Sequence, residues 1–528
     1  MSEPESASDR TKRILRRSFR VGLRSLIHAL VGAFVVLVVI FLVHLESRPD
    51  LAIWHEVELD EEFTDDDEIT SFKEYLDLEA RLFAQLDRLV YDAEDAAPAR
   101  EILRYHRGSL ADPGRRTPNW NRTFELTVET PRAGVLMLHG LSDSPYSMRS
   151  LAESLHAAGY QVLGLRIPGH GTAPSGLVRT TWEDMAAAVE LAVAHLKQQI
   201  GDRPVHLVGY SNGGALALHY ALSALENPDL PAPGRLVLMS PEVGISRLAG
   251  LAAWQERLGR LLGLEKLAWN SIDLEYDPYK YQSFALNAGK QAYRLTGEIR
   301  ARVRRLANSG DLERMPPILA FQSAVDATVS APALVSDLFD PLPRGGHELV
   351  LFDINRFVEF GPVLAHDPAE TLAALLRKSK PSFVLSVLTN KDEDSREVIE
   401  KRWELDRDDP VSSPLDHSWP PGIYSLSHVA LPFPPDDPLY GAGPFDDGEL
   451  HLGNLALYGE RGLLRISASS ILRLRWNPFH DYLERRTLEF LMSNDYSARR
   501  KSNSTCRDSS PSPGPSIVTF SLLWSVRW

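Results

Sequence analysis

The stretch VHLVGYSNGGALALHYA, residues 205–221, joins two structural patterns. Residues 205–209 have the apolar character of a buried strand, and residues 212–226 have the spacing of a helix. Ser211 lies at the joint in the pattern Gly-x-Ser-x-Gly, with Gly209 and Gly213 on either side. A strand that turns at once into a helix strains the serine backbone and leaves no room for side chains at either glycine. The pattern predicts a hydroxyl exposed at the carboxyl edge of a sheet.

Strand and helix patterns alternate on both sides of this junction. Such alternation is typical of an α/β fold in which helices cover both faces of a mostly parallel sheet. The expected strands are 124–128, 135–140, 161–167, 205–209, 235–240, 316–323 and 347–354, with two more at 383–389 and 422–427, and the expected helices are 147–158, 181–200, 212–226 and 331–339.

The alternation stops in places, and these interruptions set the expected domain boundaries. The α/β domain is expected over 121–492. A helical segment rich in Leu, Trp and Tyr at about 241–314 predicts an inserted cap, and a second insertion is expected at about 357–421. The tail, 493–528, is rich in Ser and Pro and is expected to be disordered.

The N-terminal segment has the pattern of a membrane signal anchor. Residues 26–43 read LIHALVGAFVVLVVIFLV, which predicts a transmembrane helix over 25–45. The preceding residues, 1–24, carry seven Arg or Lys, and the chain turns acidic afterwards, so the N-terminus is expected in the cytoplasm and the body outside it, in the periplasm of a Gram-negative cell. A cleaved signal peptide is the alternative. Residues 46–120 are expected to form an acidic, solvated spacer and an amphipathic helix.

Composition excludes some classes of function. The chain has 528 residues and a net charge of −14, which argues against a nucleic-acid partner. Its one cysteine, Cys506, allows no intrachain disulfide and no cysteine zinc site. We expect neither a metal nor an organic cofactor.

Two backbone N–H groups are placed to bind an oxyanion. The N–H of Asn212 opens the helix after Ser211, where the helix dipole favours negative charge. The second is the N–H of Leu141, which follows the strand 135–140, with Gly140 allowing close approach of the backbone. His139 is expected to shape this loop and not to carry protons.

These motifs resemble the α/β-hydrolase superfamily, in particular its branch of monoglyceride lipases and bacterial carboxylesterases. The resemblance implies the chain order serine, acid, histidine. Ser211 would then be the nucleophile and Asp326 the acid, with Asp353 as the alternative, and His170 would be structural. The resemblance covers about residues 121–355 and is carried by HGLSDSP (139–145), LRIPGHGTAP (165–174), WEDM (182–185), GYSNGG (209–214) and QSAVDATV (322–329).

The histidine departs from the pattern of that superfamily. It should come just after the last strand, but the strand 347–354 is followed by Asn355-Arg356-Phe357. We expect His428 to be the base, because it follows a short apolar stretch and precedes a loop. The other candidates are His366, His417, His451 and His480.

Together these features predict a membrane-anchored serine hydrolase. It would cleave a carboxylic ester of a small molecule or lipid through an acyl-enzyme, using Ser211, His428 and Asp326. The alternatives are a peptidase or amidase with the same triad, and a non-catalytic, membrane-tethered binding module with this fold.

Overall fold

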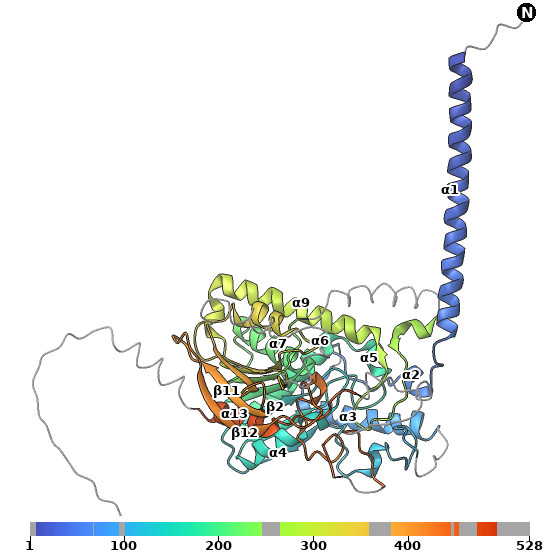
Figure 1. Ribbon diagram of the computed structural model, residues 1–528. Helices are drawn as coiled ribbons and strands as arrows, with labels where there is room; N and C mark the ends of the chain where they lie inside the picture. Colours follow the sequence, from blue (N-terminus) through green and yellow to red (C-terminus); the bar gives the residue numbers. More distant parts are fainter. Residues whose placement is uncertain are drawn as a thin grey trace, which may run out of the picture.

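A ten-stranded sheet forms the centre of the part of the chain that the computed structural model describes, residues 7–66, 68–93, 101–244, 264–357, 382–444, 448–453 and 472–493 (Figure 1). The strand order is β1-β3-β2-β4-β5-β8-β9-β10-β11-β12. All pairs from β3 to β10 are parallel, whereas β1, β11 and β12 pair antiparallel, so the predicted mostly parallel sheet is confirmed. These strands are β1 (Phe124–Leu126), β2 (Gly134–Leu138), β3 (Gln161–Leu165), β4 (Val205–Tyr210), β5 (Leu236–Met239), β8 (Ile318–Ser323), β9 (Glu348–Phe352), β10 (Val384–Asn390), β11 (Glu397–Trp403) and β12 (Val411–Ser418).

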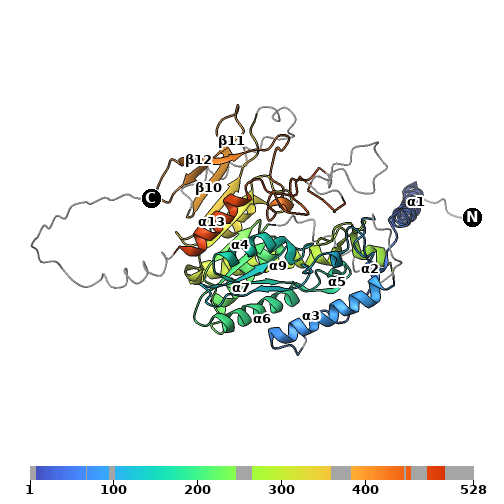
Figure 2. The same cartoon turned by 90° about the horizontal axis from the view of Figure 1, so that it is seen from below.

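Helices cover both faces of this sheet (Figures 1 and 2). In β2, Leu136 and Leu138 face one core with α6 and α7, whereas Val135 and Met137 face the opposite core with α4 and α13. A sheet buried on both faces explains why its strands are continuous apolar runs. The helices are α1 (Ala7–Glu46), α2 (Ile53–Glu56), α3 (Phe72–Leu86), α4 (Arg149–Ala157), α5 (Gly176–Arg179), α6 (Trp182–Ile200), α7 (Asn212–Glu226), α9 (Leu286–Ser309), α10 (Ala331–Leu334) and α13 (His480–Met492).

The far edge of the sheet differs from the prediction. The strand expected at 422–427 is wrong, because these residues form turns and irregular backbone. Strands β11 and β12 were not predicted, since they are largely polar and half-exposed, as edge strands are. Three strands therefore extend the sheet beyond β9 before the chain returns to it at the 3₁₀ turn His428–Ala430.

The acidic segment after α1 is not the solvated spacer that we expected. Phe63 is buried in the same core as Tyr75 of α3. Glu62 and Glu79 both bind the guanidinium of Arg166, which is 1% exposed. Glu62 of this segment is thus, together with Glu79 of α3, a partner of a buried cation, and the segment packs on the body at this point.

The described part of the expected cap has two components. A two-stranded sheet, β6 (Trp269–Ser271) with β7 (Phe284–Ala285), comes first. Helix α9 follows, and Leu295, Ile299 and Val303 bury its apolar side in the core shared with α6 and α7. The cap predicted over 241–314 therefore includes a helix of the layer that covers the sheet. The residues between 244 and 264 lie outside the described residues.

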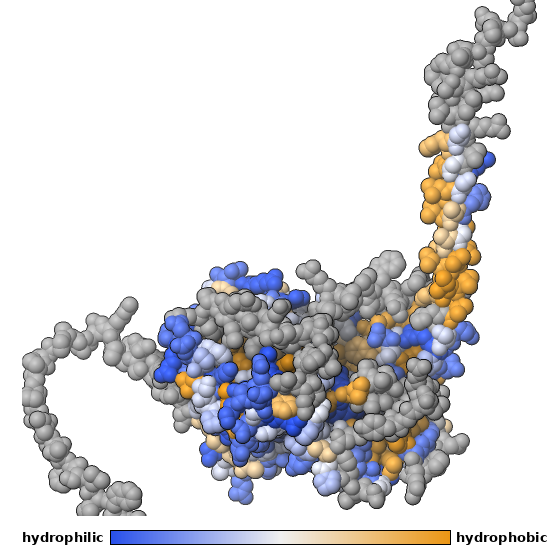
Figure 3. Space-filling view, in the orientation of Figure 1, coloured by the Kyte–Doolittle hydropathy of each residue, from blue (hydrophilic) through white to orange (hydrophobic). Residues whose placement is uncertain are grey.

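Helix α1 projects from the body and shows an apolar band to solvent (Figures 1 and 3). Within the described residues, Ser18–Phe41 is the one segment long and apolar enough to cross a membrane, a property that signal sequences share. Beyond the helix, the Arg48 guanidinium donates hydrogen bonds to the carbonyls of Lys266, Trp269 and Asn270. The chain is thus held to the body within a few residues of the end of α1.

The buried ion pairs of Arg166 make a prediction about stability. We expect Glu79→Ala to lower the free energy of unfolding by about 3–5 kcal/mol, because it leaves a buried guanidinium short of a partner. Asp77→Ala is the matched control, since it removes a carboxylate of the same helix that binds only the exposed Lys73. Guanidinium chloride unfolding of the solubilised protein measures both variants. Equal midpoints for the two would contradict a stabilising role for the buried pair.

Candidate functional site

Ser211 occupies a strained turn between β4 and α7. Its φ of 54° and ψ of −119° lie in a region of backbone conformation that residues other than glycine rarely adopt. A Cβ on Gly209 would lie 2.4 Å from the carbonyl oxygen of Gly213, and a Cβ on Gly213 would lie 2.2 Å from that of Leu138. Both glycines are therefore required for the helix to start this close to the sheet.

His428 lies between Ser211 and Asp326. Its Nε2 is 3.0 Å from the Ser211 Oγ, and its Nδ1 is 2.8 Å from the Asp326 Oδ2. Ser211 comes from the tight turn between β4 and α7, which we call the elbow. Asp326 comes from the loop after β8 and His428 from the 3₁₀ turn beyond β12, and the three side chains meet at the carboxyl ends of the parallel strands. Because Nδ1 faces a carboxylate, it carries the proton, and Nε2 is free to accept one from the serine.

Asp326 is held as a carboxylate by four donors. Burial alone would raise its pKa, but the hydrogen bond from His428 and those from the backbone N–H groups of Thr328 and Val329 outweigh it and lower the pKa below the usual value. The Gln322 amide also donates to Oδ2. A fixed negative charge therefore faces the imidazole of His428.

The loop after β2 is fixed around the N–H of Leu141. His139 Nδ1–H donates to the Gly140 carbonyl while its Nε2 accepts from the N–H of Ile167, so the ring is neutral. Burial lowers the pKa of His139 well below its usual value, in agreement with that assignment. In a trans peptide the N–H points opposite to the C=O, so this bond to the Gly140 carbonyl orients the N–H of Leu141. The buried His170 holds the next carbonyl, that of Leu141, at 2.7 Å.

The N–H of Asn212 is the other predicted oxyanion donor. It belongs to the first turn of α7, where N–H groups have no acceptor within the helix. In the loop after β2 there is no room for a side chain at Gly140, because a Cβ there would lie 2.6 Å from the Asp143 carboxylate. The N–H groups of Leu141 and Asn212 thus follow two adjacent strands, β2 and β4.

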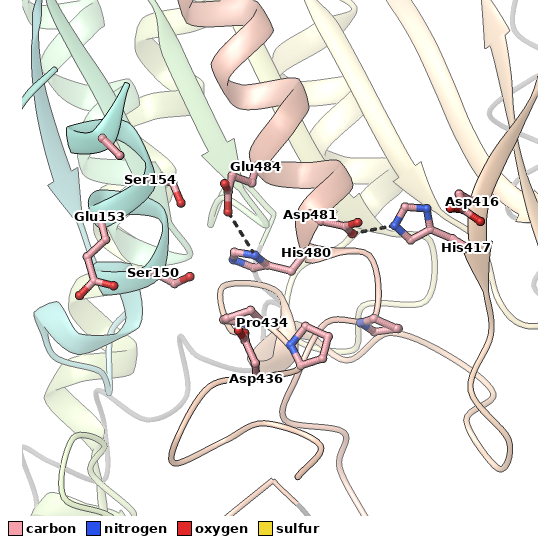
Figure 4. Close-up of a pocket in the computed structure, with 13 residues that line it drawn as sticks. Ser150, Glu153, Ser154, Asp416, His417, Pro434, Asp436, His480, Asp481 and Glu484 are labelled. Carbon is pink, nitrogen blue, oxygen red and sulfur yellow. Dashed lines mark hydrogen bonds and ion pairs between the residues drawn. The ribbon is translucent and has the colours of Figure 1, made fainter. Parts of the chain in front are cut away.

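The other candidate residues lie elsewhere. Asp353 is buried against Arg356 and Thr389, and so serves a different partner. His417 binds Asp481 and, with His480, lines a cavity of about 590 Å³ whose lining does not include Ser211, Asp326 or His428 (Figure 4). His451 contacts the carbonyl of Pro438. His366 lies outside the described residues.

Three neighbours of the site were not predicted. Tyr210 donates to the carbonyl of His428, and Gln322 donates to Asp326. Glu242, two residues after Ser240, places its Oε1 3.5 Å from the Ser211 Oγ. Glu242 could have been predicted as a neighbour of the site from its position, since it is an acidic residue just after the apolar strand 235–240.

No cluster of three or more His, Cys, Asp or Glu able to hold a metal is found in the described ranges.

Comparisons with known proteins match the middle of the chain. The family described as "Serine aminopeptidase, S33" matches residues 129–354. A thermostable monoacylglycerol lipase of Bacillus sp. (strain H-257) is 42% identical over 94 residues, 18% of this chain and 37% of the lipase. A putative 2-succinyl-6-hydroxy-2,4-cyclohexadiene-1-carboxylate synthase of Haemophilus influenzae is 33% identical over 128 residues, 23% of this chain and 49% of that protein.

The chain thus spans between a third and a half of the length of these relatives. Among solved structures, a monoacylglycerol lipase of Paleococcus ferrophilus is 19% identical, with 44% of this chain and 88% of that one covered and a TM-score of 0.33. The mostly parallel sheet is covered by helices on both faces, and the family match lies across it. The described chain therefore has the α/β-hydrolase fold, and the match places residues 129–354 in that superfamily.

Proposed function

We propose that the protein is a membrane-anchored serine hydrolase that cleaves carboxylic esters. One observation carries the proposal: His428 bridges the Ser211 hydroxyl and the Asp326 carboxylate at hydrogen-bond distance. The monoacylglycerol lipase that matches part of the chain supports an ester, including a lipid ester, as the substrate.

The geometry supports acyl transfer in two steps. His428 takes the proton of Ser211 as the hydroxyl attacks the ester carbonyl, and the N–H groups of Leu141 and Asn212 stabilise the oxyanion. His428 then gives the proton to the leaving alcohol, which leaves an acyl-enzyme on Ser211. Water, activated by the same imidazole, releases the acid and restores the serine. Asp326 holds the imidazole orientation and stabilises its charged form.

The contacts just after α1 fit an anchor that holds the body close to the membrane. Arg48, two residues after the end of the helix, is bound by three carbonyls of the body. The basic residues before the apolar run favour a cytoplasmic N-terminus and a catalytic body outside the cytoplasm.

The triad predicts how a serine-directed fluorophosphonate probe labels the solubilised protein. Ser211→Ala should abolish labelling. His428→Ala and Asp326→Asn should slow it by about 10³–10⁴-fold, because the serine loses its base or the base its correct tautomer. Labelling is followed by in-gel fluorescence against time.

Matched controls lie in the same chain. Ser144→Ala removes another buried hydroxyl, and His417→Ala removes another histidine that binds a carboxylate. Both should label at the wild-type rate. A folded wild type that fails to label would favour the non-catalytic binding module, and full labelling of His428→Ala would assign the base to another histidine.

The preference for esters predicts the turnover of matched substrates. We expect kcat/KM for a p-nitrophenyl acyl ester to exceed that for the corresponding p-nitroanilide by at least about 10²-fold, because p-nitrophenolate leaves without a proton whereas the anilide nitrogen must be protonated as it leaves. Spectrophotometric assays of both compounds measure the ratio. Preference for the anilide, especially with an aminoacyl group, would favour a peptidase, in line with the name of the matched family.

The proposed anchor predicts the location of the protein in cells. Full-length protein should remain in the membrane pellet after carbonate extraction at its full mass. In spheroplasts, added protease should digest the body but leave a cytoplasmic N-terminal tag intact. A shortened, soluble product in the periplasm would instead identify residues 25–45 as a cleaved signal.

A further inference from the structure

Glu242 is a buried carboxyl group that the mechanism above does not use. Its Oε1 lies 3.5 Å from the Ser211 Oγ, and its Oε2 is buried with no hydrogen-bond partner among the described residues. The residue is 6% exposed. We propose, on the basis of the proposed function, that Glu242 sets the pH range in which Ser211 attacks: the neutral carboxylic acid permits attack and the carboxylate suppresses it.

The backbone holds Glu242 in this position from several sides. Its N–H donates to the carbonyl of Ser211, and its own carbonyl accepts from the Thr296 hydroxyl of α9. Ser240, two residues before Glu242, has a φ of 43°, and its N–H is bound to the carbonyl of Phe321 in β8. The backbone of Glu242 is therefore held beside Ser211 on a strained turn.

The surroundings of Glu242 disfavour its charged form. Burial raises its pKa to about 7; the contact with Ser211 opposes the rise, and the charge of Asp326 adds to it. The titratable groups around it are Asp326, the Tyr210 phenol and His428, which shares the serine hydroxyl. No Lys or Arg of the described chain contributes to the stabilisation of a carboxylate here.

Ionisation of Glu242 would act against attack in two ways. Ser211 has one proton, and a carboxylate at Oε1 competes with the Nε2 of His428 as its acceptor. A second negative charge near the attacking oxygen also repels the oxyanion that forms, in a site where water screens little. The neutral acid does neither, so the serine proton goes to His428. Because the pKa is raised to about 7, the active protonated form is lost as the pH increases through that value.

The test measures the rate of fluorophosphonate labelling of the full-length, solubilised protein between pH 5 and pH 9. The wild-type rate should fall above pH 7, to about 100-fold below its maximum at pH 9, as expected for a single ionisation. Glu242→Gln, which is always neutral, should show no fall. Glu242→Met, also neutral but without a donor, should likewise show none, and it serves if the Gln variant does not fold.

Glu275→Gln is the matched control. Glu275 is also buried, with its pKa raised to about 7 by burial, but it binds the backbone N–H groups of Gln282 and Ser283. This variant should keep the wild-type fall in rate, since the ionisation of a remote buried acid affects stability and not the serine. Melting temperatures at pH 6 and pH 9 verify that each variant is folded.

The outcomes separate the two proposals. A wild type that labels but shows no fall above pH 7, or an equal fall in Glu242→Gln, would overturn the role of Glu242 and leave the proposed function standing. A folded wild type that labels at no pH would overturn the proposed function, and the role of Glu242 with it.

Discussion

The close approach of α7 to β4 is the constraint on which the site depends. Helix α7 begins one residue after Ser211, and the missing side chains of Gly209 and Gly213 let its first turn lie against the carbonyl of Leu138. The serine takes up the strain, with φ at 54°. The same geometry directs the hydroxyl away from the sheet and the first N–H groups of α7 toward the space beside it. The backbone conformation of this one turn thus positions both the proposed nucleophile and one proposed oxyanion donor.

The position of His428 depends on the extension of the sheet. After β9 the chain adds three strands, β10 to β12, and only then returns to the edge where Ser211 lies. Tyr210, which is next to the serine, donates to the carbonyl of His428, so the returning turn is tied directly to the elbow. The added strands lengthen the chain between acid and histidine, yet the imidazole still lies between Ser211 and Asp326. Insertions of this kind are tolerated when the ends that they connect are held by other contacts.

Local patterns in the sequence predicted more than long-range ones did. The elbow follows from the spacing of Gly209, Ser211 and Gly213, and the buried strands follow from continuous apolar runs. His428 was preferred because a strand was expected before it; that strand is absent, yet the imidazole lies between Ser211 and Asp326. The acidic segment was interpreted wrongly because the cation that it binds, Arg166, is about a hundred residues away in the sequence. Strands β11 and β12 were missed because polar edge strands carry little periodic signal.

Two carboxyl groups near one hydroxyl show how environment can assign different roles to the same chemistry. Asp326 receives four hydrogen bonds, and these outweigh its burial and keep it charged opposite His428. Glu242 is equally enclosed but has one weak contact and an unpartnered oxygen, and the charge of Asp326 further disfavours its ionisation. If both were charged, Asp326 would face the Nδ1 of His428, and Glu242 would compete with Nε2 for the serine proton. Asp326 has four hydrogen-bond donors and Glu242 has one weak contact, so the pKa values of the two acids differ. The negative charge is therefore on Asp326, on the side of the imidazole that faces away from the serine.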